Sequence, residues 1–231
     1  AALQQEQQTA ELREQFIAVL GHDLRNPLFA ISASAEMLRR KCPNPVSDKL
    51  VQHILASTGR AAQLVDDVLD FARGRLGNGI PLSIAPCADL ADALRHVISE
   101  IQSVHSQRVI HSSIGDLQGV QCDRNRVAQL LSNLLANAID HGDPQGAVEV
   151  SAAVEHGTLQ LSVKNRGQIP QEQLPRLFQP YSRPSGDNTR AGLGLGLYIA
   201  SQIAQSHGGQ LQVLSTAQDG TQFTFSLPTS V

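Results

Sequence analysis

The first residues able to do chemistry are His22, Asp23 and Asn26, which lie in one predicted helix. An apolar stripe with three-to-four spacing marks one face of this helix: Phe16, Leu20, Leu24, Pro27, Ile31 and Leu38. His22 is two positions past Leu20, about 200° around the axis, and is predicted to face solvent. Asp23 and Asn26 share this exposed patch. A solvated helix face is the plain interpretation, and chemistry on the imidazole is the functional one.

A second polar pair, Asn133 and Asn137, has i,i+4 spacing in a predicted helix. Both amide oxygens can therefore face one cation. Neutral oxygen ligands suit a magnesium ion whose other ligands are phosphates and water. Two such asparagines alone are weak support for a metal site.

A glycine-rich run precedes the last predicted helix: Gly192, Leu193, Gly194, Leu195, Gly196 and Leu197. Alternating glycines allow a tight turn that presents backbone amides to a phosphate at the helix N-terminus. The polar segment 183–190 lies just before this run. Its Arg183 and Arg190 can reach such phosphates or remain solvated charges.

The order of these groups is more specific than any one of them. The segments around His22, at 133–138, 177–181 and 192–197 resemble the H, N, F and G2 boxes of sensor histidine kinases, the phosphodonor half of two-component signalling. The resemblance implies that bound Mg-ATP transfers its γ-phosphoryl group to His22. It implies Asp23 as the general base, and Asn26 as the residue that positions water to dephosphorylate a response regulator.

The resemblance also assigns the nucleotide site. It implies that Asn137 is a magnesium ligand assisted by Asn133, that residues 192–197 bind phosphate, and that segment 183–190 is a lid over ATP. His141, directly after the Asn137 helix, is placed beside the nucleotide. After autophosphorylation, the phosphoryl group would pass to an aspartate in the receiver domain of a response regulator.

Two positions depart from the family pattern. Relatives carry Asp-x-Gly-x-Gly-Ile, whose Asp accepts a bond from the adenine amino group, whereas this chain has Asn165-Arg166-Gly167-Gln168-Ile169. Aligning Asn165 and Gly167 with Asp-x-Gly keeps an oxygen acceptor and shortens the segment by one residue. The other alignment places Lys164 there, which cannot accept a bond. Some phytochrome-type kinases have a similar Asn. Asp140 replaces a basic residue of many relatives and can weaken ATP affinity by repulsion.

The elements before residue 76 are predicted to be helical. One long helix is expected from Leu3 to about Arg40, bent at Pro27, and residues 42–45 end it. The next helix has a heptad seam of Leu50, Ile54, Ser57, Ala61, Leu64, Val68 and Phe71. Two helices cannot bury such seams alone, so a homodimeric four-helix bundle is expected, with a monomeric hairpin as the alternative.

The glycine-rich segment 73–79 predicts a boundary between a helical hairpin over residues 1–76 and a second domain over residues 80–231. Helices are expected near 88–104, 123–140 and 194–206. Strands are expected near 109–111, 120–122, 148–154, 159–163, 210–214 and 222–227, and Leu82 and Ile84 alternate before them. The fold class is therefore α+β: a helical hairpin followed by an α/β sandwich that resembles the Bergerat ATP-binding fold.

Composition excludes several classes of partner. A net charge of −3 and 3% aromatic residues argue against nucleic-acid binding. No apolar run is long enough to span a membrane, so direct membrane contact is not expected. Three widely spaced cysteines favour a reducing compartment. We expect the cytoplasmic core of a sensor, itself cytoplasmic or membrane-bound, whose upstream sensory domain is absent from this sequence.

Two other functions compete with this prediction. The departures at Asn165 and Asp140 leave open a degenerate kinase that acts as a dimeric interaction module with weak or no ATP binding. An ATPase of the chaperone or topoisomerase kind needs a catalytic Glu where this chain has Asn133, so it is disfavoured.

Overall fold

A computed structural model describes residues 24, 26, 28–41, 45–75, 79–181 and 194–229. The chain divides into two compact units, residues 1–78 and 79–231.

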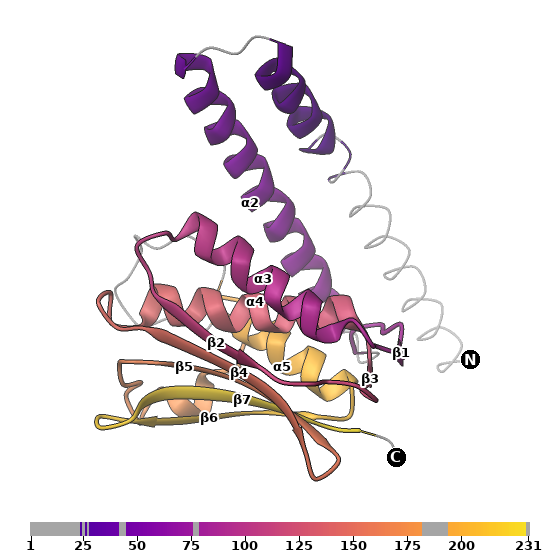
Figure 1. Cartoon of the computed structure of the whole chain (residues 1–231), viewed down its shortest axis with the longest axis vertical. Coiled ribbons are helices and arrows are strands. Elements are labelled where there is room, and N and C mark those ends of the chain that lie inside the picture. Colours follow the sequence, from indigo (N-terminus) through magenta and orange to yellow (C-terminus); the bar gives the residue numbers. More distant parts are fainter. Residues whose placement is uncertain are drawn as a thin grey trace, which may run out of the picture. The chain divides into compact units, whose positions relative to one another are not determined.

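The first unit contains two helices that run side by side (Figure 1). Residues 28–41 are helical, and α2 spans Pro45–Arg75. Pro45 suits the first position of a helix, where its missing N–H costs no bond. The two helices are joined by a hydrogen bond of 2.8 Å that Ser32 Oγ donates to Thr58 Oγ1.

One stripe of α2 is buried or half-buried within the unit. It has its own four-three spacing: Val51, Leu55, Thr58, Ala62, Val65 and Leu69. The heptad seam expected from the sequence is the neighbouring stripe. Four of its large members, Leu50, Ile54, Leu64 and Val68, are 39–61% exposed in the single chain, and Phe71 is half-buried. A single chain therefore buries one stripe of α2 and leaves the other apolar stripe exposed to solvent.

The apolar stripe of the first helix is also exposed where it is described. Leu24, Ile31 and Leu38 are 43–55% exposed, whereas Ala35 is buried and Ser32 bonds to α2. This exposure agrees with the expectation that two helices cannot bury such seams alone, and the small residues Ser32 and Ala35 let α2 pack on the adjacent face. Large apolar side chains from both helices thus remain unburied.

The second unit is built on a five-stranded mixed sheet with strand order β2-β4-β5-β7-β6. The strands are β2 (Ile110–Ile114), β4 (Val148–Glu155), β5 (Thr158–Asn165), β6 (Gln210–Thr216) and β7 (Gly220–Pro228). β2 and β4 are parallel, and all other neighbours are antiparallel. This confirms the predicted mixed sheet, with each strand extended by a few residues.

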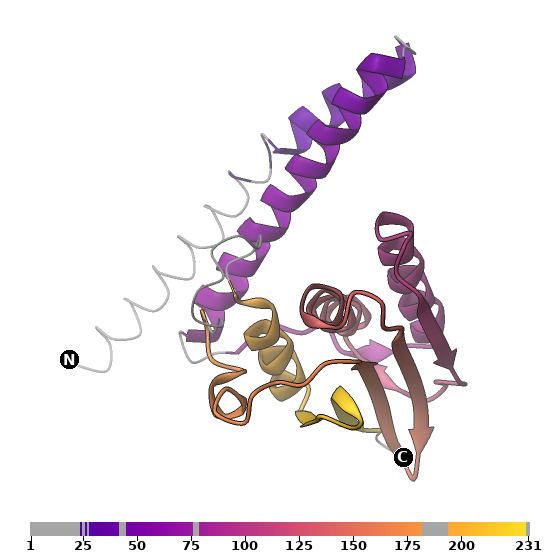
Figure 2. The same ribbon diagram turned by 90° about the vertical axis from the view of Figure 1, so that its left-hand side faces the viewer.

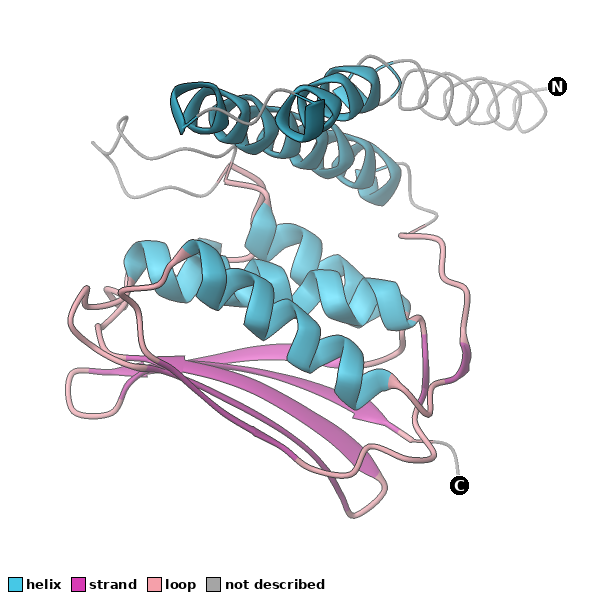
Figure 3. Cartoon of the chain, turned by 45° about the horizontal axis from the view of Figure 1, so that its top comes forward, coloured by secondary structure: helices cyan, strands magenta, loops and turns pink. Residues whose placement is uncertain are grey.

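Three helices cover one face of this sheet, and Figure 3 shows them as one layer above the strands. They are α3 (Leu90–Val104), α4 (Arg124–His141) and α5 (Gly196–Ser206). The strands alternate accordingly, since Leu159, Leu161 and Val163 of β5 are buried and their neighbours are not. The other face of the sheet carries polar side chains. The class predicted from the sequence, helices on one face of a mixed sheet, is therefore confirmed.

The β4–β5 connection is a two-residue turn. Glu155 pairs with Thr158, and His156 and Gly157 both have positive φ (50° and 73°). This is the backbone twist that suits a tight hairpin.

A small sheet accompanies the main one: β1 (Ala85–Pro86) pairs antiparallel with β3 (Gln121–Cys122). Cys87 and Cys122 are buried free thiols beside this pair. Burial raises the pKa of the Cys122 thiol, which keeps it protonated and unreactive. A single 3₁₀ turn, Leu174–Arg176, follows β5. Among the residues that the structure describes, no helix has the length and apolar character needed to cross a membrane.

Candidate nucleotide site

The central helix α4 carries the predicted polar residues on one side. Asn133, Asn137 and His141 are spaced by four residues, which places them about 6 Å apart along the axis. The two asparagines are half-buried and His141 is exposed. Asp123 fixes the start of this helix, because its carboxylate accepts bonds from the backbone amides of Asn125 and Arg126.

The start of α5 lies against the first of these asparagines. Gly194 has φ of +69°, a conformation that favours glycine, and Leu195 is buried. A Cβ added at Gly196 would lie 3.7 Å from Asn133 Oδ1. No side chain of the described residues caps this helix, so its first amide groups point outward without a side-chain acceptor. Asn133 and the amide-rich end of α5 therefore face one location that suits a phosphate.

Asn165 lies at the opposite end of α4. It is 6% exposed and ends β5. Its Nδ2 donates to Arg166 O (2.9 Å), the same carbonyl that accepts a bond from the Asp143 amide (2.8 Å). The fit against α4 is tight, because a Cβ added at Gly142 would come within 2.8 Å of Asn165 Nδ2. Gly167 lies beside it, near the carbonyl of His141. The structure thus brings Asn165, Gly167 and His141 together.

Three buried side-chain atoms have no hydrogen-bond partner in the described chain: Asn165 Oδ1, Asn133 Nδ2 and Arg108 Nε. Burying such a group unpaired is costly, and most native proteins avoid it. Asn165 Oδ1 can accept a bond from an amino group at one end of α4, and Asn133 Nδ2 can donate one at the other. The donor and acceptor chemistry fits an elongated ligand with an amino-bearing base and an anionic end.

The oxygen donors available for a metal ion are those of Asn133 and Asn137. Among the described residues, no cluster of three or more His, Cys, Asp or Glu side chains forms a metal site. Two neutral amides provide too little charge to hold a bare divalent cation. They fit an ion that arrives with phosphate oxygens as ligands.

The remaining predicted residues lie mostly outside this region or outside the described chain. Asn26 is exposed on the first helix. Five residues predicted for the site lie outside the described residues: His22, Asp23, Arg183, Gly192 and Leu193. The ends of segment 182–193 are joined, since the Tyr181 amide donates to Gly194 O (3.1 Å). Leu197, in the first turn of α5, is half-buried.

Sequence reasoning missed three residues that contact this site. Ser215 and Thr221 bond to the backbone that follows Asn165. Arg108 donates to Ala138 O (3.4 Å) and to Asp143 O, at the C-terminal end of α4. Thr221 lies two residues before Phe223 in β7, so the alternation of that strand already places its hydroxyl on the buried face.

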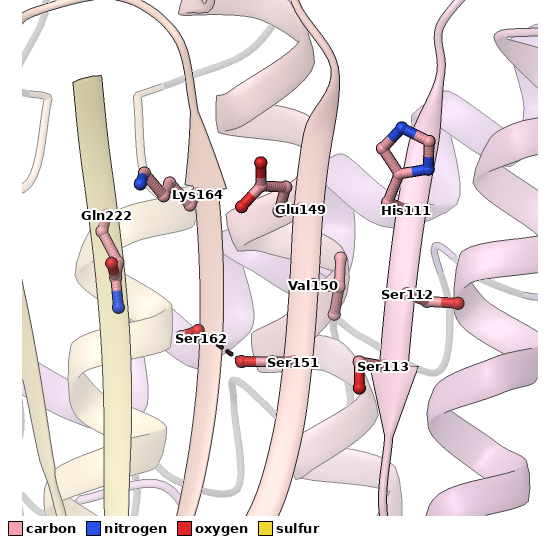
Figure 4. A pocket seen from close by; sticks show the side chains of 9 residues that line it. All are labelled: His111, Ser112, Ser113, Glu149, Val150, Ser151, Ser162, Lys164 and Gln222. Carbon is pink, nitrogen blue, oxygen red and sulfur yellow. Dashed lines mark hydrogen bonds between the residues drawn. The ribbon is translucent and has the colours of Figure 1, made fainter. Parts of the chain in front are cut away.

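A second hollow lies on the other face of the sheet, away from the helices. His111, Glu149, Lys164 and Gln222 stand side by side on four strands, above the Ser151–Ser162 hydroxyl pair (Figure 4). This groove encloses about 440 Å³. An adjoining pocket shares His111, Glu149 and Lys164 with this groove and reaches Asn165 and Gly167.

The fold and the site define a domain of the ATPase class. Residues 122–231 match the family described as "Histidine kinase-, DNA gyrase B-, and HSP90-like ATPase". Residues 12–77 match the "His Kinase A (phospho-acceptor) domain". The chain belongs to the sensor histidine kinases, and it corresponds to their phospho-acceptor and ATP-binding core.

Individual relatives agree with this assignment. The chain is 38% identical to a bacteriophytochrome of Pseudomonas aeruginosa over 221 residues, covering 94% of this chain and 30% of the relative. It is 32% identical to the sensor histidine kinase YkoH of Bacillus subtilis, covering 92% of this chain and 47% of YkoH. The chain thus spans about a third to a half of the length of these relatives.

Solved structures share the fold. Full-length ShkA, crystallised in complex with AMPPNP, is 28% identical with a TM-score of 0.69, covering 94% of this chain and 46% of ShkA. The Acinetobacter baumannii histidine kinase AdeS is 20% identical with a TM-score of 0.57, covering 91% of this chain and 98% of AdeS, and shows the shared fold alone.

Proposed function

We propose that this core binds Mg-ATP in its second unit and autophosphorylates on His22. The observation that supports this most directly is the line of polar groups along α4, from the unpartnered Asn165 Oδ1 to Asn133 at the uncapped start of α5. The phospho-acceptor family match at residues 12–77 includes His22.

In this proposal each end of α4 binds one end of the nucleotide. Asn165 Oδ1 accepts a bond from the adenine amino group, and Gly167 and His141 border the base. The amides of residues 192–197 bind phosphate oxygens, with Arg183 contributing charge. Asn137, assisted by Asn133, holds the magnesium ion, which when bound offsets the negative charge of the phosphates.

The phosphoryl transfer itself uses residues of the first unit. A ring nitrogen of neutral His22 attacks the γ-phosphorus, a P–N bond forms, and the P–O bond to the ADP leaving group breaks. Asp23 orients the imidazole and takes the ring proton that this step releases. The products are phosphohistidine and ADP.

Two later steps belong to the same proposal. The phosphoryl group passes from His22 to an aspartate carboxylate of a response-regulator receiver domain, and so becomes an acyl phosphate. Asn26, exposed on the same helix, positions a water molecule that hydrolyses that acyl phosphate. The core would thus act as kinase and as phosphatase.

The exposed seam of α2 supports a homodimer as the working form. Leu50, Ile54, Leu64 and Val68 repeat with heptad spacing and lie uncovered in the single chain. A second copy of the hairpin offers the same stripe, so the two can complete a four-helix bundle.

The test is incubation with γ-labelled Mg-ATP. We expect acid-labile label on the wild type and on His53→Gln, a control at an exposed α2 histidine, and none on His22→Gln. Label that persists on His22→Gln would overturn the assignment of the acceptor. A folded wild type that takes no label and binds no fluorescent ATP analogue would favour the degenerate interaction module.

A further inference from the structure

The interface between the two helices of the first unit contains a pair of hydroxyl groups. Ser32 Oγ, in the helix of residues 28–41, donates to Thr58 Oγ1 of α2 (2.8 Å). Thr58 is 7% exposed and Ser32 is half-buried. Thr58 belongs to the buried stripe of α2, whose other members are all apolar. The pair is therefore a polar contact within an apolar interface.

The Thr58 hydroxyl uses its own proton inside α2. Thr58 Oγ1 lies 2.9 Å from Ile54 O and 3.0 Å from Leu55 O, and it donates to these carbonyls of the preceding turn. A hydroxyl has one proton and two acceptor sites. Thr58 Oγ1 therefore accepts the proton of Ser32, and the bond between the helices has one direction, from Ser32 to Thr58.

Ser32 does not need this partner in order to satisfy its proton. A serine inside a helix can donate to the carbonyl four residues before it, and the exposed Ser34 does so, to Ala30 O at 2.8 Å. The carbonyl of Leu28 stands at the same spacing from Ser32. The Ser32 proton thus has two acceptors within reach, and the structure uses the one that depends on how the two helices lie against each other.

That choice specifies the axial register of the hairpin. Apolar stripes with heptad spacing can pack in registers that differ by a turn, about 5.4 Å, because each register brings apolar side chains together. A shift by one turn would bring Ser32 opposite Leu55 or Ala62, whose side chains accept no hydrogen bond. One buried polar residue in such a stripe specifies the register, at a cost in stability.

We propose that Ser32 and Thr58 are positioning residues for the phospho-acceptor, because their hydrogen bond fixes the register of the first helix against α2 and hence the place of His22. This inference rests on the proposed function. The sequence predicts one helix from Leu3 to about Arg40, in which His22 precedes Ser32 by ten positions. An attacking atom must lie within about 3.5 Å of its target, so a shift by one turn takes the imidazole out of reach.

Two variants break the bond and two serve for comparison. Thr58→Val keeps the shape of the side chain and removes the acceptor, and the Ser32 proton can then turn to Leu28 O, so that no buried group is left unpaired. Ser32→Ala removes the donor. Thr58→Ser restores the hydroxyl, and Ser34→Ala is the matched control because its 2.8 Å bond stays within its own helix. The measurements are thermal unfolding and the kcat and KM for ATP of autophosphorylation.

We expect Thr58→Val and Ser32→Ala to lower kcat roughly 3-fold to 10-fold, since the acceptor is less well positioned. KM for ATP should stay within about 2-fold, because the proposed nucleotide residues belong to the second unit. Thr58→Val should unfold at the wild-type temperature or above it, because an apolar group replaces a buried hydroxyl. The double variant should be as slow as either single variant, since both changes remove the same bond. Thr58→Ser and Ser34→Ala should resemble the wild type.

Several results would overturn the inference. They are an unchanged kcat in Thr58→Val and Ser32→Ala, an equal loss of kcat in Ser34→Ala, and losses that multiply in the double variant. A lower unfolding temperature in Thr58→Val that accounts for its loss of activity would show that the pair only stabilises the hairpin. A folded wild type that takes no label from γ-labelled ATP would instead overturn the proposed function and, with it, the role assigned to this pair.

Discussion

Asn165 combines near-complete burial with a carbonyl oxygen that no group in the described chain engages. Its amide orientation is set, because Nδ2 already donates to Arg166 O. An aspartate at this position could accept bonds only, whereas the asparagine uses one atom for the protein and keeps the other for a ligand. The departure from the family motif therefore preserves the acceptor.

Asn165→Leu should raise the dissociation constant for ATP roughly 10-fold to 100-fold, since a base amino group would be desolvated without an acceptor. The measurement is titration with a fluorescent ATP analogue. Asn125→Leu, at an exposed asparagine in the first turn of α4, is the control and should bind as the wild type does. Equal affinity in Asn165→Leu and Asn125→Leu would show that Asn165 does not contact the base.

We expect Asp67 of α2 to make the stability of the helical unit depend on pH. Burial is the main reason that its pKa is raised, and the neighbouring charges of Asp70 and Asp66 raise it further, against the bond that Gln63 donates. The folded protein thus holds this proton more tightly than the unfolded chain. Ionising Asp67 therefore lowers the free energy of unfolding. This loss is absent at pH values below the ordinary Asp pKa of about 4, and it is complete at pH values above the raised pKa of Asp67.

Asp67→Asn should accordingly stabilise the helical unit near pH 7 and have little effect near about pH 3. Thermal unfolding followed by circular dichroism at several pH values measures the difference from the wild type. Asp48→Asn is the comparison, because Asp48 lies in the first turn of the same helix, where a negative charge is favourable. A stability difference for Asp67→Asn that does not grow with pH would contradict the prediction.

At the scale of single elements, α2 carries two apolar stripes one position apart. The stripe through Val51 and Leu69 is buried, and the stripe through Ile54 and Leu64 is exposed. Both have heptad spacing, so spacing alone did not reveal which stripe packs inside the hairpin. The four-three pattern of the sequence identified the stripe that stays exposed in the single chain.

A double variant, Ile54→Glu with Leu64→Glu, should convert a dimer into a monomer, because four like charges would meet in a symmetric interface. Gln52→Glu, exposed on α2 outside the seam, should remain dimeric. Light scattering coupled to size-exclusion chromatography gives the masses. If the double variant remained a dimer, the dimer interface would not be the exposed stripe of α2.

Element prediction succeeded where the pattern is local. The two strands of the β4–β5 hairpin were expected near 148–154 and 159–163 because apolar and polar residues alternate there, and the helix expected near 123–140 is α4. The two-residue pairing of β1 with β3 was not predicted in detail, since such short strands have almost no period to detect. The start of α5 was expected at Gly194 and lies at Gly196, because Gly194 adopts positive φ.

At the scale of the whole molecule, the second unit contains its own core. Its largest buried side chains come from α3, α4, α5 and the central strands, among them Leu90, Leu134, Leu161, Ile199 and Phe223. The site residues Asn133, Asn137, Asn165 and Gly196 all belong to this unit.

A fragment of residues 79–231 should therefore fold alone and bind ATP within about 3-fold of the full chain, while taking no label from γ-labelled ATP because it lacks His22. Circular dichroism and nucleotide titration check the first two expectations, and autoradiography checks the third. Labelled fragment would indicate a second acceptor. A fragment that is folded but does not bind would indicate that the first unit contributes to the nucleotide site.

Only part of the candidate site could be predicted from the sequence. Asn133, Asn137 and Gly196 were found because spacing in a helix or a glycine run reveals them. Ser215 and Thr221 were not, since their contact with Gly167 and Ile169 depends on the register of strands about fifty residues further along the chain. Register between distant strands is fixed by packing, and a local pattern does not encode it.

The position of β7 has a consequence for how the chain is made. β7 is the last strand of the described residues, yet it pairs with both β5 and β6 inside the five-stranded sheet (Figure 1; Figure 2 gives the same ribbon turned by 90°). A nascent chain that has not yet released residues 220–228 from the ribosome has β6 without a neighbour and β5 with one open edge. The first unit, whose contacts are close in sequence, can form early in synthesis. The second unit must wait for β7, and until then the edges of β5 and β6 that β7 pairs with are exposed to chaperones or to other chains.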